Sequence, residues 1–233
     1  MNNYKVKYYG HSAYSVETEN HFLLFDYVGN TNVDFYNEQI TLSQKTINFK
    51  SISKPITMFH SHTHFDHYSP KLHTKLSNYD NIFTIVGEKI KKYKNSTYLI
   101  AGDSININGI QIFAVPSTDI GVCFVLKVDG ITIYYAGDNI DWGDSEDTSI
   151  KYISYINDIA TSISNNIDIA FVPVCNFHGQ SYPELTNSAI YACKKLNAKE
   201  IYPMHSQHST RPYVYFKQYC QLINADLNVV IPQ

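Results

Sequence analysis

The chain has 233 residues, of which 44% are hydrophobic and 17% are charged, and its formal net charge is −3. This length and composition are typical of a soluble α/β protein with a sizeable core, and we expect residues 1–233 to form a single domain. The charge offers no basic face to a nucleic-acid backbone, so we expect a small-molecule substrate and no nucleic acid.

The first sixty residues predict short strands joined by turns. Tyr4 to Tyr9, Ala13 to Glu17 and Phe22 to Tyr27 alternate in part between apolar and polar residues, which favours an antiparallel start to a sheet. Residues 28–54 are polar and rich in asparagine, and we expect loops and one short helix there, in a segment that would be placed to cover a site. The apolar run Ile56 to Phe59 predicts a further strand.

The rest of the chain mixes strands and helices. Ser69-Pro70 begins a helix that extends to about Leu76, because proline at the first helical position loses no hydrogen bond. Ile82 to Val86 predicts a strand followed by a short lysine-rich helix, and strands return from Tyr98 to Ala136, with Asp129-Gly130 as a two-residue hairpin turn. The last third predicts the helices Asp147 to Ile163, Glu184 to Leu196 and Pro212 to Ile223, and the strands Ile167 to Val174, Glu200 to Pro203 and Leu227 to Ile231.

Two strand-rich halves, each ending in helices, favour an α/β (α+β) fold of four layers: two sheets face to face with helices outside, an αββα sandwich. No stretch approaches the roughly 20 apolar residues that cross a bilayer, and the N-terminal residues show no apolar signal region. We therefore expect a cytoplasmic protein with no membrane contact. Its four cysteines have no C-x-x-C spacing and are expected to be free thiols.

The segment after Phe59 concentrates residues that bind metals, with His62, His64, Asp66 and His67 within six positions. In an extended chain residues two apart point the same way, so we expect His62, His64 and Asp66 on one side and the intervening Thr63 and Phe65 towards the body of the protein. Imidazoles and a carboxylate this close disfavour one another's charged forms unless a cation joins them, and they suit Zn, Fe or Mn. The alternative is a solvated loop that happens to be rich in histidine.

The spacing His62-x-His64-x-Asp66-His67 resembles the signature of the metallo-β-lactamase superfamily of metal-dependent hydrolases. Gly10-His11-Ser12-Ala13 also resembles the opening of one branch, the lactonase-like and uncharacterised small hydrolases. In that branch His11 would line the site; otherwise it is a turn histidine.

The resemblance implies two ligands further along the chain. Asp138 follows a predicted strand at the point where the superfamily's aspartate bridges two metals, although a turn or cap aspartate is the ordinary alternative. His205 follows the strand Ile201 to Met204, where the family has its final ligand. The implied metal ligands are His62, His64, Asp66, His67, Asp138 and His205.

The chain departs from the family in one place. The family usually supplies another histidine before the bridging aspartate, and the matching stretch Val115 to Val122 has none. Asp119, a hydroxyl of Ser117 or Thr118, or water would replace it, and a carboxylate would shift the site towards Mn or Fe. His178, in a loop after a buried strand, is a candidate replacement ligand, substrate-binding residue or proton donor to a leaving group, or an ordinary loop histidine.

We therefore expect a hydrolase with one or two divalent ions, zinc first and Mn or Fe next, in a binuclear site. Asp66 and Asp138 are the expected catalytic residues, orienting an activated water against an ester, lactone, amide or phosphoester. Two alternatives remain: a metal-binding protein of the same fold without turnover, and a phosphodiesterase or nuclease of the superfamily.

Overall fold

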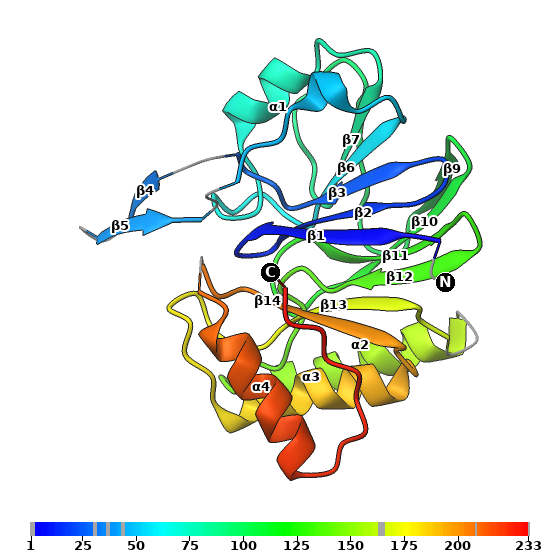
Figure 1. The fold of residues 1–233 in the computed structure, drawn as a ribbon. Helices are drawn as coiled ribbons and strands as arrows, with labels where there is room; N and C mark the ends of the chain where they lie inside the picture. Colours follow the sequence, from blue (N-terminus) through cyan, green and yellow to red (C-terminus); the bar gives the residue numbers. More distant parts are fainter. Residues whose placement is uncertain are drawn as a thin grey trace.

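Two β-sheets lie face to face in a computed structural model, which describes residues 3–29, 32–35, 38–42, 45–162, 166–207 and 209–232 (Figure 1). Residues 32–35 and 38–41 are described by their backbone alone. Sheet one contains, in spatial order, β1 (Lys5–Gly10), β2 (Ala13–Glu17), β3 (Phe22–Phe25), β6 (Ile56–His60), β7 (Ile82–Val86) and β8 (Ser96–Tyr98). Sheet two contains β14 (Glu200–Met204), β13 (Ile169–Pro173), β12 (Ile131–Tyr135), β11 (Val122–Val128), β10 (Ile110–Pro116) and β9 (Ser104–Ile107).

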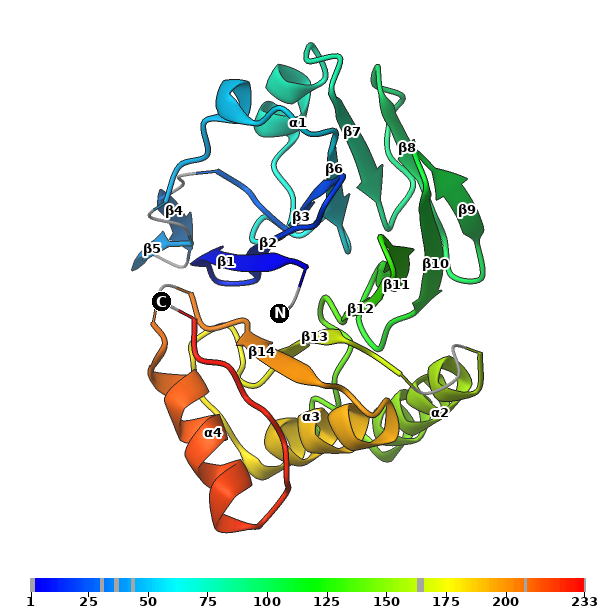
Figure 2. The ribbon, with the colours of Figure 1, turned by 45° about the vertical axis from the view of Figure 1, so that its right-hand side comes forward.

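Helices cover the outer face of each sheet, as the two views together show (Figures 1 and 2). Helix α1 (Pro70–Leu76) packs on sheet one. Helices α2 (Glu146–Ser162), α3 (Pro183–Lys195) and α4 (Arg211–Leu222) lie on the far side of sheet two. The predicted αββα sandwich is therefore confirmed. That residues 1–233 form a single domain stays a prediction.

Residues 28–54, for which the sequence predicts loops and one short helix, contain a hairpin as well. Strands β4 (Asn32–Phe35) and β5 (Glu38–Thr41) pair antiparallel and project from the side of the molecule (Figure 1). A 3-10 helix follows at Phe49–Ser51.

The alternation of buried side chains in β3 explains why the middle of sheet one can be covered on both faces. Leu23 and Phe25 pack into the core between the sheets, whereas Phe22 and Leu24 pack towards α1. The ring of Phe25 stacks on Tyr135 of sheet two, with ring centroids 4.7 Å apart. The core is thus continuous between the sheets and holds their strand ends in a fixed relation.

Two predicted elements are wrong. The lysine-rich segment after β7 is not helical; four lysines within residues 89–94 repel one another and leave no apolar face to pack. The predicted last strand, Leu227 to Ile231, is a single bridge between Val229 and Ile201. The next backbone N–H on this edge of β14 would belong to residue 203. That residue is Pro203, which has no N–H, so the pairing with the C-terminal segment cannot continue.

All four cysteines are buried free thiols. Within the described ranges, no helix is both long and apolar enough to cross a membrane.

Candidate metal centre

One edge of the sandwich collects the residues that the sequence singles out. His11 follows β1, the His62–His67 segment follows β6, Asp119 follows β10, Asp138 follows β12 and His205 follows β14. Strand β3 runs parallel to β6, and β12 runs parallel to β13 and β14. The carboxyl ends of parallel strands open on the same side, where sites commonly form, so residues far apart in the chain meet here.

The segment from His62 to His67 turns instead of running straight. The amides of His67 and Tyr68 both donate to the carbonyl of His64, at 3.0 and 2.9 Å. This turn sends His62 and His64 to one cluster and Asp66 and His67 to another, so the predicted common side for His62, His64 and Asp66 is wrong. Thr63 and Phe65 are exposed instead of facing the body of the protein.

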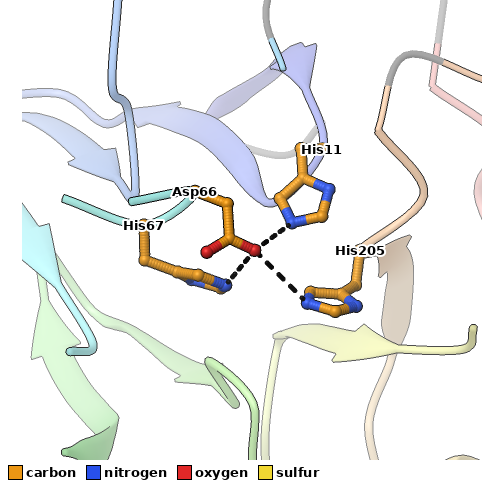
Figure 3. Close-up of side chains that lie close together, drawn as sticks. All are labelled: His11, Asp66, His67 and His205. Carbon is orange, nitrogen blue, oxygen red and sulfur yellow. Dashed lines mark hydrogen bonds and ion pairs between the residues drawn. The ribbon is translucent and has the colours of Figure 1, made fainter. Parts of the chain in front are cut away.

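The first cluster, called the buried cluster, consists of His11, Asp66, His67 and His205, all of them buried (Figure 3). Asp66 lies at its centre. Its Oδ2 atom is 3.1 Å from His11 Nε2 and 3.5 Å from His67 Nε2. The same oxygen is 3.8 Å from His205 Nε2.

The second cluster, called the half-open cluster, consists of His62, His64, Asp119 and Asp138. His62 Nε2 lies 2.9 Å from His64 Nδ1, which is 3.7 Å from Asp119 Oδ2. The side chains of His64 and Asp119 are 47% and 31% exposed, so this cluster opens to solvent. Asp119 belongs to the stretch in which the sequence lacks the expected histidine, and it lies beside His64. Its role as a metal ligand stays a prediction.

The two hydroxyl candidates for the same position are engaged elsewhere. Ser117 Oγ accepts a hydrogen bond from the amide of Asp119, at 3.2 Å. Thr118 Oγ1 donates to the carbonyl of Ile140, at 2.7 Å. The Thr118 bond fastens the loop after β10 to the loop that carries Asp138.

Asp138 joins the two clusters. Its Oδ1 lies 3.2 Å from His67 Nε2, and its Oδ2 lies 3.4 Å from His205 Nε2 and 3.7 Å from His62 Nε2. His67 Nε2 and Asp138 Oδ1 are buried, and neither has a hydrogen-bond partner among the described residues. Buried polar atoms without partners are costly, so two such atoms facing one point fit a shared cation. Imidazole nitrogens and carboxylate oxygens are suitable ligands for Zn, Mn or Fe.

Asp26, which directly follows β3, holds this arrangement from behind, and the sequence reasoning missed it. Its buried carboxylate accepts from His67 Nδ1 at 2.6 Å, from the Ser61 amide at 2.8 Å and from the Tyr135 hydroxyl at 2.7 Å. A carboxylate on the rear nitrogen fixes the ring and leaves the other nitrogen's lone pair for a metal. The signal in the sequence is an aspartate at the end of the apolar run Phe22–Phe25.

The hydrogen bond made by the Nδ1 atom of His205 and of His11 decides whether the Nε2 atom of the same ring can offer a lone pair to a metal. His205 Nδ1 lies 3.1 Å from the Cys175 carbonyl and must donate to it, which frees Nε2. His11 is the reverse case. Its Nδ1 accepts the backbone N–H of Gln207 at 2.9 Å, so its Nε2 carries the proton and donates to Asp66. His11 therefore positions Asp66 while that bond lasts.

Charge in the centre is balanced by pairing of opposite sign. Burial alone would lower the pKa of His67, but the carboxylates of Asp138, Asp66 and Asp26 hold it well above its usual value. Burial would raise the pKa of Asp138, yet His205 and His67 hold it well below the usual range. His62 is different, because burial, aided by the nearby His67, lowers its pKa to about 3 and keeps it neutral.

Glycines let three loops approach the backbone at Ser61 and His62. Gly121 (φ +79°) and Gly137 (φ +55°) adopt left-handed conformations, and a Cβ on either one would collide with Ser61 or His62. Gly87 is packed against the Ser61 carbonyl in the same way. Close approach at these points brings both clusters to one place.

His178 lies in neither cluster. It is exposed on the loop after β13 and lines a separate cavity with residues of the loop after His205.

An αββα sandwich with this ligand set at its strand ends defines a metal-binding protein of the metallo-β-lactamase class. The chain belongs to this superfamily, because the family described as "Beta-lactamase superfamily domain" matches residues 5–205. Among curated proteins it is similar to the UPF0173 metal-dependent hydrolase YtkL of Bacillus subtilis, with 23% identity over 90% of this chain and 88% of the relative.

Two solved structures show the same fold. The metallo hydrolase Igni18 of Ignicoccus hospitalis has a TM-score of 0.70 and 19% identity, over 99% of this chain and 95% of that one. The diiron β-hydroxylase CmlA of Streptomyces venezuelae has a TM-score of 0.65 and 11% identity, over 98% of this chain and 52% of that one.

Proposed function

We propose that this chain, a metal-dependent hydrolase of the β-lactamase superfamily, holds two divalent ions between its clusters and cleaves an ester, lactone, amide or phosphoester of a small molecule. Zinc is the first expectation, with Mn or Fe next, because Asp119 adds a hard oxygen donor to the half-open cluster. A net charge of −3 favours a small molecule over a polynucleotide.

One observation carries the proposal. His67 Nε2 and Asp138 Oδ1 are buried and lie 3.2 Å apart as an ion pair, but neither atom makes a hydrogen bond of regular geometry with any described group. A packed structural cluster would satisfy such atoms, as nearly all buried polar groups are satisfied. Their arrangement is that of ligands directed at an ion.

The position of each residue in the two clusters determines its expected role in catalysis. When bound, the ions supply an activated water near neutral pH and polarise the bond to be cleaved. Asp138 reaches both clusters and sets their separation, while the N–H of His11 orients Asp66. His64 and Asp119 lie on the open side, so the substrate approaches there. The ring centroid of Trp142 lies 5.9 Å from that of His205, beside the buried cluster.

The experiment measures metal and turnover on the same preparations. We expect metal-loaded protein to hydrolyse a generic lactone or a phosphodiester reporter, and a chelator or Asp138→Ala to abolish both turnover and tight metal binding. Asp144→Ala, an exposed aspartate in the same loop, is the matched control and should change neither. Turnover on the phosphodiester alone would favour the phosphodiesterase alternative.

Bound metal without turnover on either reporter would favour the metal-binding protein that lacks hydrolysis. Wild-type protein that takes up no divalent ion would refute the proposed site altogether.

A further inference from the structure

A cavity of about 400 Å³ adjoins the buried cluster and has no part in the mechanism above. Three segments form it: the loop after β13, the loop after β14 and the start of α4. The loop after β13 and the start of α4 lie side by side in both views (Figures 1 and 2). The polar side chains of the lining include those of His178, Ser181, Ser206, Gln207, Arg211 and Tyr215.

The charged side chain that lines the cavity is positive. Arg211 is the only arginine in the sequence, and no aspartate or glutamate lines the cavity. Arg211 forms no ion pair with any residue that the structure describes. In a chain of net charge −3, an isolated arginine in a concave site creates local attraction for an anion.

The walls of the cavity are already fixed, so they do not compete for Arg211. Ser206 Oγ donates to the Ser209 carbonyl, and Gln207 Nε2 donates to the Phe177 carbonyl at 2.9 Å. Ser209 Oγ accepts the backbone N–H of Arg211, and the guanidinium itself forms no ion pair with any described residue. A guanidinium presents a planar fork of donors that matches a carboxylate or a phosphate.

The cavity and the buried cluster share one wall. Ser206 directly follows His205, and the backbone N–H of Gln207 bonds to His11, whose other nitrogen is 3.1 Å from Asp66. A substrate that extends from the clusters past Gln207 would bring a second group to Arg211.

We infer that this cavity binds an oxyanion of the substrate, a carboxylate or a phosphate group, through Arg211, with His178 at its rim. The inference rests on the proposed hydrolysis and names the class of substrate: small esters or lactones that carry an anionic group away from the bond that is cleaved. Neutral substrates lack a partner for Arg211 and bind less tightly.

The test compares three 4-nitrophenyl esters of equal chain length that end in a methyl, a carboxylate or a phosphonate group. In metal-loaded wild type, we expect kcat/KM to be at least tenfold higher for one or both anionic esters than for the neutral one. Arg211→Ala should remove that preference and leave the neutral ester unchanged, and Arg211→Lys should retain part of it. Lys217→Ala, on the same helix, is the control and should behave as wild type. The ratio of the two anionic esters identifies the preferred oxyanion.

Two outcomes separate this inference from the proposed function. Hydrolysis of all three esters at equal rates, or a preference that persists in Arg211→Ala, overturns the inference and leaves the hydrolase intact. If no ester is hydrolysed, calorimetric titration with glutarate and with inorganic phosphate decides the question directly. Binding that Arg211→Ala abolishes supports the oxyanion site, and no binding to wild type refutes it.

Discussion

Two aspartate–histidine groups lie at opposite ends of the sandwich and use their polar atoms differently. At the far end, Asp129 accepts hydrogen bonds from Thr18 Oγ1, from the Asn20 backbone and side chain, and from His21 Nδ1, at 2.6 to 3.0 Å. At the metal centre, Asp138 Oδ1 and His67 Nε2 have no such partner.

The difference separates a structural role from a functional one. The Asp129 group ties the turn after β2, in sheet one, to the turn after β11, in sheet two, and every bond it makes is within the protein. The centre at the other end leaves these two atoms without a hydrogen bond, and a bound cation would satisfy both. We infer that similar residue types carry different roles at the two ends, and variants of each group test this difference.

The largest effect expected from this contrast is stabilisation by metal. A divalent ion at a thousandfold excess over its Kd should stabilise the fold by about 4 kcal/mol, which raises the thermal midpoint by roughly 10 °C. Asp138→Asn should lose this gain, whereas Asp129→Asn should keep it. Thermal unfolding with and without Zn or Mn measures both, and an equal gain in the two variants would remove the distinction between the groups.

The support behind the centre should matter next. Asp26→Asn removes the charge that orients His67, and we expect metal affinity to fall about 10- to 100-fold. Competition with a chromogenic chelator measures the change. Tyr135→Phe, which removes one donor to Asp26, is the milder control and should cost less. Unchanged affinity in Asp26→Asn would mean that His67 is held by packing alone.

The structural group should respond to pH rather than to metal. Partial burial would raise the pKa of Asp129, but hydrogen bonds from Asn20, Thr18 and His21 hold it well below its usual range. A depressed pKa stabilises the fold above the unfolded-state value of about 3.9, and the gain is lost as pH falls below it. Because Asp129 is exposed and solvent screens its interactions, Asp129→Asn should cost only about 1 kcal/mol at pH 6, and the cost should shrink towards pH 3. Urea unfolding across that range tests it; a constant cost would contradict it.

Within the metal centre, the smallest effect is expected at His11, which has both ring nitrogens engaged. His11→Asn suits the positive φ of +49° and removes the N–H that positions Asp66. We expect hydrolysis to fall about tenfold, the value of one hydrogen bond to a charged group, with metal content per chain unchanged. A loss of bound metal in this variant would show that His11 is a ligand.

Much of the fold can be predicted from the sequence, because apolar periodicity and turn residues determine strands, helices and turns through local contacts. Asp129-Gly130 and Ser69-Pro70 mark a turn and a helix start that the structure contains. The resemblance of the His62–His67 spacing to the superfamily signature likewise implied which distant residues would meet. What escaped prediction depends on contacts between distant segments: Asp26 gains its role only because Phe25 pairs with Phe59, which brings it under Ser61.

Which of Ser117, Thr118 and Asp119 faces the half-open cluster also depends on contacts between distant segments. Thr118 is committed to the loop after Asp138, a contact that no local pattern reveals. The turn at His64 had the same origin, because an alternating pattern is informative only while the chain remains in a strand. That the six predicted ligands bind metal stays a prediction, although the structure gathers all of them within one centre.

The glycines packed against Ser61 imply an uneven tolerance to mutation. A methyl group at position 121 would collide with Ser61 and His62, and one at position 137 would collide with the Ser61 side chain, so either should displace the segment that carries the clusters. A random mutagenesis screen for inactive variants should therefore recover substitutions at Gly121 and Gly137 as often as substitutions at the predicted ligands. Exchanges on the exposed lysines should pass unnoticed.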